Sequence, residues 1–437
     1  MRRYHAIVTL ACVVTAGCGS VPAPDVATAA TAARDGQARQ VRVAPDRPPG
    51  DTSGLAAGSL QRALADGAVD LILAPGHYYL HASTYEDPAC GNCEDPSERV
   101  AATVGVRISG PGISIRGSNP DSVVVHTGAG YGLLFEDCSG CALRGVTVTG
   151  GTRDADGRAT DAGVVIRRSD VVLEDCIVRD NIGDSATVAA TIVGIAGVAL
   201  REGSDATIRR CRILRNSWDG IALYRGAKGV VTDNVIDGVD RASGARIGGG
   251  RGVGIGATWD AIARIEGNLV RRYWKGIGVF VEADAEVREN VVEDILTWGI
   301  ALWGPAGSTP AARVEDNAIH LTGACGVLVD RQDGGGAPGS LAGNIVMRTG
   351  QAERYDSGEP YCWQRPIARH RVPAGFVESG NLLWDNRQPR AAGSAPPPLP
   401  ELSREAFVRR AGPLAGRLAT RPALVGALLW DTPGLRP

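Results

Sequence analysis

The sequence predicts an all-β fold, a solenoid of short parallel strands with a helix near each end. Three observations predict it. Two short motifs alternate from about residue 104 to 346 and recur in phase. Glycine is abundant, at 59 residues, whereas phenylalanine occurs 4 times, which suits many turns around a narrow core. An asparagine recurs at one place in the later repeats, and a repeat of roughly 22 to 35 residues is typical of solenoids.

The N-terminal residues have the pattern of an export signal. Arg2 and Arg3 precede an apolar run over 6–16 that is too short to cross a bilayer as a helix. The run ends in Thr-Ala-Gly-Cys at 15–18, which resembles the lipobox of bacterial lipoproteins, although Thr15 stands where leucine is usual. This resemblance implies a signal peptide over 1–17 and lipidation of Cys18. An ordinary signal peptide cleaved nearby is the alternative.

The next segment leads into the first coil. Residues 18–56 are rich in alanine, proline, glycine and aspartate without periodicity, which predicts a flexible tether. Residues 59–65 have helical apolar spacing and precede a strand and turn over 71–78. A short helix here would cover the first coil and blunt an open sheet edge.

The first repeated motif is a glycine followed by alternating apolar residues. Alternation with period two predicts a half-buried strand. The eight copies are Gly132–Phe135, Gly163–Ile166, Gly197–Leu200, Gly220–Leu223, Gly252–Ile255, Gly276–Val279, Gly299–Leu302 and Gly326–Val329.

The second motif places one residue, here called the ladder residue, at a corner between two apolar positions. Neighbouring coils lie about 4.8 Å apart, so an asparagine at this corner can hydrogen-bond to the next through its side-chain amide. The ladder residues are Val146, Cys176 and Cys211 in the early copies and Asn234, Asn268, Asn290, Asn317 and Asn344 in the later ones.

These two motifs together resemble the pectin-lyase-like superfamily of right-handed parallel β-helices, over residues 57–386. The leucine-rich repeat, the main structural rival, is disfavoured because its Leu-x-x-Leu-x-Leu pattern is absent. The resemblance implies that a substrate lies along the outward face of the Gly-led strands. The paired Asp-Asp and Gly-His motifs of polygalacturonases and the Asp-Pro-His-Asp motif of mannuronan epimerases are absent. The fold alone therefore leaves the chemistry open.

The C-terminal part is less regular. Residues 351–375 hold aromatic residues, Cys362 and four arginines, and we expect an insertion in the β-helix. A last coil is predicted at 380–384. Residues 387–437 contain a proline-rich stretch and a helix predicted over 402–418, which could cap the far end of the solenoid.

The cysteines suggest disulfides, because an exported chain matures in an oxidising compartment. Beyond Cys12 and Cys18 the chain holds Cys90, Cys93, Cys138, Cys141, Cys176, Cys211, Cys325 and Cys362. We expect local pairing within 90/93 and 138/141, although four thiolates could also bind zinc. The ladder residues 176 and 211 either pair with each other or stay as buried thiols. The remaining two should tie the last regular coil to the insertion.

The outward face of the Gly-led strands carries the candidate binding residues. A column of small residues is expected at Ala199, Ala222, Gly254, Gly278 and Ala301. The residues two positions further on flank it, including Gly256. Of these we assign Tyr224, Phe280, Trp303 and Asp330 to substrate binding. Aromatic faces beside small residues suit stacking on sugar rings. The competing interpretation is that these rings pack under loops and fill corners.

The residues just before the glycines give the catalytic candidates. Asp219, Arg251 and Lys275 are expected on three successive coils, each about 5 Å from the next. The two cations could neutralise a uronate carboxylate while one basic group removes the adjacent proton. A plain ion-pair ladder is the alternative. Glycoside hydrolysis fits less well, because Asp219 and Asp330 stand about 20 Å apart instead of the roughly 5 to 9.5 Å required.

The sequence therefore favours a monomeric, outer-membrane lipoprotein that binds polysaccharide. A lyase or epimerase acting on acidic glycans and a non-catalytic scaffold are the alternatives. The net charge of −2 gives no reason to expect nucleic acid as a partner. No cofactor is expected and no histidine pattern suggests a metal. The acidic loop over 86–95 could bind calcium, but a solvated disulfide loop is the simpler interpretation.

Overall fold

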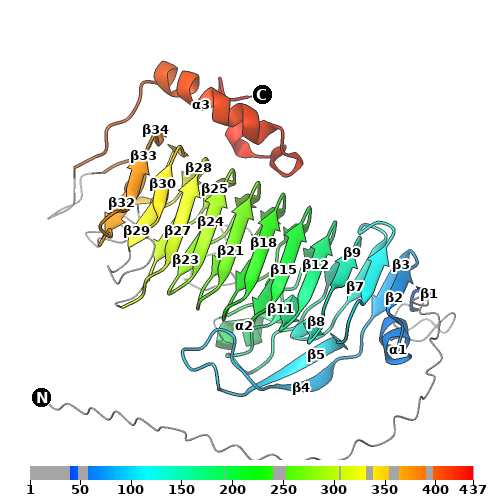
Figure 1. Cartoon of the computed structure of the whole chain (residues 1–437). Helices are drawn as coiled ribbons and strands as arrows, with labels where there is room; N and C mark the ends of the chain where they lie inside the picture. Colours follow the sequence, from blue (N-terminus) through cyan, green and yellow to red (C-terminus); the bar gives the residue numbers. More distant parts are fainter. Residues whose placement is uncertain are drawn as a thin grey trace, which may run out of the picture. The chain divides into compact units, whose positions relative to one another are not determined.

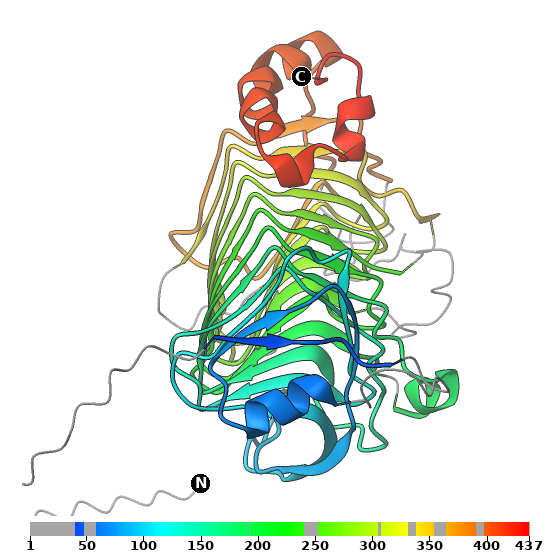
Figure 2. The ribbon, with the colours of Figure 1, turned by 90° about the vertical axis from the view of Figure 1, so that its right-hand side faces the viewer.

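The computed structural model describes residues 40–47, 58–191, 193–239, 252–304, 307–330, 338–353, 364–389 and 397–436. Within these residues the chain winds into a right-handed parallel β-helix of three sheets (Figures 1 and 2). This confirms the predicted fold. The export signal and Cys18 lie outside the described residues. The predicted tether ends earlier than expected, because residues 40–43 form a strand that pairs with 70–73.

Each coil contributes one strand to each sheet. Sheet 1 holds the Gly-led strands and is made of β4 (Ser83–Asp87), β5 (Val100–Ile108), β8 (Tyr131–Glu136), β11 (Ala162–Arg167), β14 (Ala196–Arg201), β17 (Ile221–Leu223), β20 (Val253–Ala257), β23 (Lys275–Phe280), β26 (Ile300–Trp303), β29 (Val327–Asp330) and β32 (Ile367–His370). All its pairs are parallel except β4 with β5, which is antiparallel.

The other two sheets complete the coil. Sheet 2 is made of β1 (Gln40–Val43), β2 (Asp70–Leu73), β6 (Ser114–Gly117), β9 (Cys141–Arg144), β12 (Asp170–Glu174), β15 (Asp205–Arg209), β18 (Lys228–Thr232), β21 (Ile262–Glu266), β24 (Asp284–Arg288), β27 (Ala311–Glu315), β30 (Ser340–Ala342) and β33 (Val377–Ser379). Sheet 3 is made of β3 (Gly76–Tyr79), β7 (Val123–His126), β10 (Thr147–Thr149), β13 (Ile177–Arg179), β16 (Arg212–Leu214), β19 (Val235–Asp237), β22 (Leu269–Arg271), β25 (Val291–Ile295), β28 (Ala318–Thr322), β31 (Ile345–Met347) and β34 (Leu382–Trp384).

The core is a stack of aliphatic columns along the axis. In each Gly-led strand, the apolar residue that follows the glycine points inward and packs on the equivalent residue of the next coil, as the period-two pattern predicts. One such column runs Leu133, Val164, Val198, Ile221, Ile255, Ile277, Ile300 and Val327.

The predicted asparagine ladder is present at the corner between sheets 2 and 3. The side-chain oxygen of Asn290 accepts hydrogen bonds from the backbone N–H of Asn268 at 2.9 Å and from its side-chain amide at 3.0 Å. The same arrangement repeats from residue 234 to Asn381, and the inner members are fully buried. The ladder thus satisfies buried backbone groups at a turn, where no strand partner is present.

The strand register differs from the prediction at β20. Ala222 pairs with Gly256, and Gly256 pairs with Gly278, so the motif starts at Gly254 and not at Gly252. A Cβ at position 254 would collide with the side chain of the core residue Val270, so Gly254 faces inward. Gly256 takes the place predicted for Gly254. The two-residue shift arises because the alternating glycines at 252, 254 and 256 made two alignments of the pattern equivalent.

The two ends of the solenoid are covered differently. Helix α1 (Ser59–Ala65) covers the first coil, with Leu60 buried against the core, as predicted. Helix α3 (Arg404–Ala419) matches the helix predicted at 402–418 and forms a helical cap on the C-terminal coils. It packs with η4 (Pro422–Leu424) and η5 (Leu428–Asp431) on the outward face of sheet 3 (Figure 2). Phe376 and Leu399 pack against the core near its last coil.

Two further features differ from what the sequence indicated. Part of the predicted insertion at 351–375 belongs to the β-helix, because β32 pairs with β29 in sheet 1. A short helix that the sequence did not indicate, α2 (Ser185–Thr191), lies between β13 and β14.

The cysteines follow the local-pairing prediction. Cys90 bonds to Cys93 and Cys138 bonds to Cys141. Cys176 and Cys211, in contrast, are buried thiols and form no disulfide. Their sulfur atoms point to backbone carbonyls of the preceding coils, at 3.4 Å and 3.5 Å, as the asparagine amides do further along the ladder. Cys325 is buried, but Cys362 lies outside the described residues, so their pairing stays a prediction.

Candidate functional site

The outward face of sheet 1 brings most of the predicted site residues onto one surface. Between β17 and β29 this face, here called the trough, has a floor of small residues, Ala222, Gly256, Gly278 and Ala301. Phe280, Trp303 and Asp330 stand side by side along it, in the predicted register. Thr258, next to Ala257, takes the place between Tyr224 and Phe280 that the sequence assigned to Gly256.

The cluster around Lys275 is the most distinctive feature of the trough. Its ammonium nitrogen lies 4.3 Å from the ring centre of Trp274, 4.6 Å from Trp298, 5.2 Å from Phe280 and 6.0 Å from Trp303. These distances fall within the range of cation–π attraction. Within the described residues its ammonium makes no hydrogen bond or ion pair. Burial lowers the pKa of Lys275 to about 8, against a smaller opposing effect of Asp219.

Gly278 leaves the space in which the side chains around Lys275 pack. A Cβ on Gly278 would lie 2.0 Å from the ring of Phe280, so that ring folds back over its own strand. Lys275 and Phe280 are five residues apart on β23, yet their side chains approach across Gly278. A larger residue at this position would push the ring away from the ammonium.

Asp219 is a buried anchor. One carboxylate oxygen accepts the backbone N–H of Val253 at 2.7 Å, and the other accepts the hydroxyl of Tyr224 at 3.1 Å. Burial raises the pKa of Asp219 to about 6. Because both oxygens are used, this carboxylate holds the start of β20 in place.

The predicted Asp219–Arg251–Lys275 column is not formed. The position between Asp219 and Lys275 is occupied by Val253, because of the two-residue shift at β20. Arg251 itself lies outside the described residues. Asp219 and Lys275 are therefore two coils apart, about 10 Å.

The carboxylate of Asp330 is also engaged in hydrogen bonds to neighbouring side chains. One of its oxygens accepts hydrogen bonds from Arg371 at 2.7 Å and from the ring of His370 at 3.0 Å, and the residue is 2% exposed. It closes the aromatic end of the trough as part of an ion-pair cluster. This arrangement favours a structural role over direct contact with a ligand.

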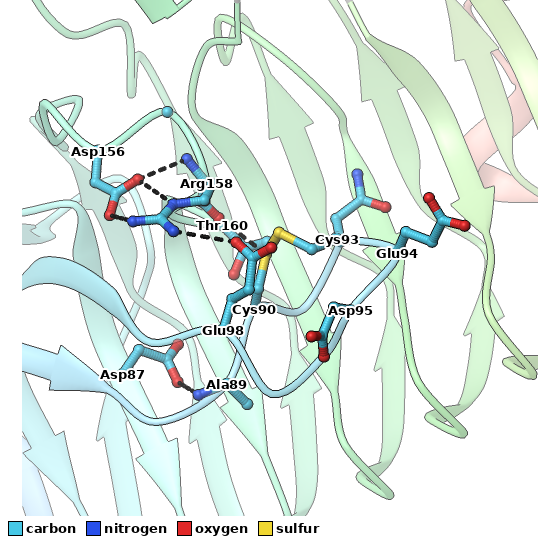
Figure 3. Close-up of a disulfide and its surroundings, with 12 residues drawn as sticks. Asp87, Ala89, Cys90, Cys93, Glu94, Asp95, Glu98, Asp156, Arg158 and Thr160 are labelled. Atoms are coloured by element: carbon cyan, nitrogen blue, oxygen red, sulfur yellow. Dashed lines mark hydrogen bonds and ion pairs between the residues drawn. A yellow bond between two sulfur atoms is a disulfide. The ribbon is translucent and has the colours of Figure 1, made fainter.

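The opposite end of the trough lies under a flap that the sequence analysis treated as a loop. Residues 88–99 leave β4, are closed by the Cys90–Cys93 disulfide and cross the outward face of the strands (Figure 3). Asn92 accepts a hydrogen bond from the indole of Trp259 at 3.1 Å, and Arg158 joins Glu98 of the flap to Asp156. The flap thereby spans several coils.

A buried ionic cluster fastens the flap. Asp87 accepts hydrogen bonds from Arg201 at 2.6 Å and from Arg167 at 2.7 Å, and from the hydroxyl of Tyr131 at 2.7 Å. Both Asp87 and Arg201 are fully buried. The carboxylate predicted as a possible calcium ligand is therefore neutralised by arginine. The described residues contain no group of three or more side chains able to hold a metal ion.

Sequence reasoning missed two parts of this surface. Trp274 and Trp298 precede two of the Gly-led strands and were not assigned to the site. Trp298 occupies the position of Lys275 one coil further along the solenoid. Aligning the repeats would therefore have placed this ring beside the lysine. The flap carried no such signal, because its contacts join residues far apart in sequence.

The fold defines a right-handed parallel β-helix protein. The sequence matches the family described as "Right handed beta helix region" over residues 104–245, and no curated protein matches it. Among solved structures, the Dettilon tailspike protein is similar, with 16% identity, 79% of this chain covered and a TM-score of 0.50. This chain spans 62% of the tailspike's length.

Two enzymes are also similar in fold. The mannuronan C-5 epimerase A-module of Azotobacter vinelandii has 14% identity, with 75% of this chain and 82% of that chain covered and a TM-score of 0.41. An alginate lyase from Paenibacillus has 14% identity, with 78% and 99% covered and a TM-score of 0.39. At such identities the likeness concerns the fold alone. None of the described helices has the length and apolar character needed to cross a membrane.

Proposed function

We propose that this protein binds polysaccharide along the trough. The observation that carries the proposal is the Lys275 ammonium surrounded by four aromatic rings on the outward face of sheet 1. Partly exposed rings offer stacking surfaces to the apolar C–H faces of sugars. The ammonium adds a donor for sugar hydroxyl or carboxylate oxygens.

The energetic cost of this lysine supports a binding role over a packing role. A cation held away from water destabilises the folded state unless it is paired, and within the described residues Lys275 has no carboxylate partner at ion-pair distance. Methionine would fill the same space without that cost. Cation–π attraction to the four rings offsets part of this cost, and the ammonium can still donate hydrogen bonds to a ligand.

The test is a binding screen of the soluble domain with polygalacturonate as the acidic and dextran as the neutral polysaccharide. We expect Trp303→Ala and Phe280→Ala to weaken binding by up to about tenfold, because each removes a stacking surface worth up to about 1.4 kcal/mol. Trp384→Ala is the matched control, since this ring packs on Phe407 under the C-terminal helix. It should lower stability and leave binding unchanged. Loss of stability in the trough variants without binding of either polysaccharide would instead support a scaffold.

The second candidate function is a lyase or epimerase acting on acidic glycans. It is favoured by the lowered pKa of Lys275, about 8, since a lysine must lose its proton to act as a base. Incubation with polygalacturonate should then give unsaturated or epimerised products at a rate that rises as the pH passes 8. Lys275→Met should abolish them. Retained binding without such products would leave binding as the sole function.

We further propose that the chain is exported and anchored through a lipid on Cys18. The support is the lipobox-like sequence at 15–18, and Gly19 in place of the aspartate retention signal favours the outer membrane. Cys18→Ala should release the protein from the membrane fraction or block its maturation. Unchanged membrane association of this variant would refute lipid anchoring.

A further inference from the structure

A pocket of about 220 Å³ lies at the flap end of the trough. Its walls come from four separate segments: the flap with Cys93, the loop with Arg158 and Asp161, the chain from residue 193 into β14, and the residues on either side of β17, Trp218 and Tyr224. Ala199, one of the small outward residues, lies among its lining. Trp218 and Tyr224 flank Asp219, so the pocket adjoins the trough at β17.

The pocket is closed on the side of the earlier coils. Outward residues of β8 and β11, such as Tyr131, Leu134 and Val165, are fully buried beneath the flap and the neighbouring loops. Arg201 stands at this side, fully buried and bonded to Asp87, Thr160 and the carbonyl of Ala89. A glycan lying along the trough therefore has no path beyond β14.

The size and lining suit one sugar residue. The volume is below the 300 to 1,000 Å³ that is typical of sites for larger ligands. Trp218 is half-buried and offers a ring to a sugar face. Asp161 in the lining is buried; it pairs with the buried Arg153 and its Oδ2 accepts the N–H of Asp154 at 2.7 Å, so it serves to hold the wall of the pocket. The polar side chains of Asn92 and Arg158 also belong to the lining, and polar groups in such a pocket can fix the orientation of a bound hydroxylated ligand.

We propose that this pocket receives the terminal sugar of the bound polysaccharide, so that the protein recognises chain ends. The inference rests on the proposed function of the trough. A dead-end groove admits one chain terminus, whereas an open groove binds the interior of a chain at many places. The pocket adds end recognition to the stacking surface around Lys275.

The test measures how many protein molecules bind one glycan chain as the chain lengthens. Isothermal titration would use oligogalacturonates, isomalto-oligosaccharides and their parent polymers, taking the series that binds. End recognition predicts one protein per chain at every length beyond the trough, with constant affinity per chain. A number of bound proteins that grows in proportion to chain length would overturn the inference and leave the proposed function intact. No binding of either series would overturn both.

Variants of the pocket give an independent measurement. Trp218→Ala should weaken binding of the short oligosaccharides by about tenfold, the effect of one stacking surface. The double variant Cys90→Ser with Cys93→Ser loosens the part of the flap that lines the pocket and should also weaken binding. Cys138→Ser with Cys141→Ser is the matched control, because that disulfide has the same spacing but is not part of the pocket lining. Unchanged affinity in folded Trp218→Ala would contradict the proposal whether or not the cysteine variants fold.

Discussion

The asparagine ladder can be tested by removing one of its central members. Asn290 is fully buried and makes five side-chain hydrogen bonds. Its oxygen accepts the backbone N–H and the amide of Asn268, and its amide donates to Ile265, Arg288 and Asn317 at 2.9 Å each. In Asn290→Ala the N–H of Asn268 has no remaining acceptor, which costs about 1–3 kcal/mol. With the weaker losses of the other bonds, we expect about 3 kcal/mol less stability.

Asn381→Ala is the matched control at the end of the same ladder. Asn381 accepts the same two hydrogen bonds from Asn344 but donates one, to Leu341, and it is partly exposed. Water can replace its contacts, so its loss should cost less than about 1 kcal/mol. Urea unfolding followed by far-UV circular dichroism compares the two variants through their midpoints. Equal midpoints would refute the argument that burial makes the ladder stabilising.

Three further results are expected. Because the pKa of Lys275 is lowered to about 8, the folded state loses this proton before the unfolded state does, so stability should rise with pH between about 8 and 10.5. Lys275→Met should remove this rise and stabilise the protein at pH 7 by up to about 3 kcal/mol, and a wild-type urea midpoint that is flat over that window would contradict the reasoning. Cys176 and Cys211 should react with a thiol reagent in denaturant and not in buffer, whereas labelling of the folded protein would show that the ladder corner opens. Arg421 hydrogen-bonds to Asp233, Glu266 and Glu289, so Arg421→Ala should speed tryptic cleavage in α3, and an unchanged cleavage rate would show that apolar packing alone holds the segment.

The functional surface could be predicted in part from the sequence. The neighbours Phe280, Trp303 and Asp330 were placed correctly, because strands of equal phase stack in register. The position between Asp219 and Lys275 was not, since the glycines at 252, 254 and 256 allow two phases of the same pattern. Local sequence cannot choose between them; the choice is made by cross-strand packing, where Ile255 must point inward against Ile221 and Ile277.

The chemical state of the site residues also required the structure. Asp219 was chosen as a carboxylate beside two cations and Asp330 as a carboxylate on the outward face, yet both are buried and hydrogen-bonded. Lys275 was chosen as a charge partner, and it lies instead among aromatic rings. Such environments come from side chains of neighbouring coils and loops, and the residue type alone does not specify them.

The sequence by itself determined the solenoid, its parallel strands and the asparagine ladder. These features recur in successive coils, so the same sequence pattern is present many times and each copy supports the same structural assignment. Only the tertiary structure decided where the flap lies and that the C-terminal helix packs on sheet 3. The contacts of Asp87 with Arg201 and of Arg421 with Asp233 join residues more than a hundred positions apart. Each such contact occurs once in the chain, and a feature that does not recur leaves no periodic signal in the sequence.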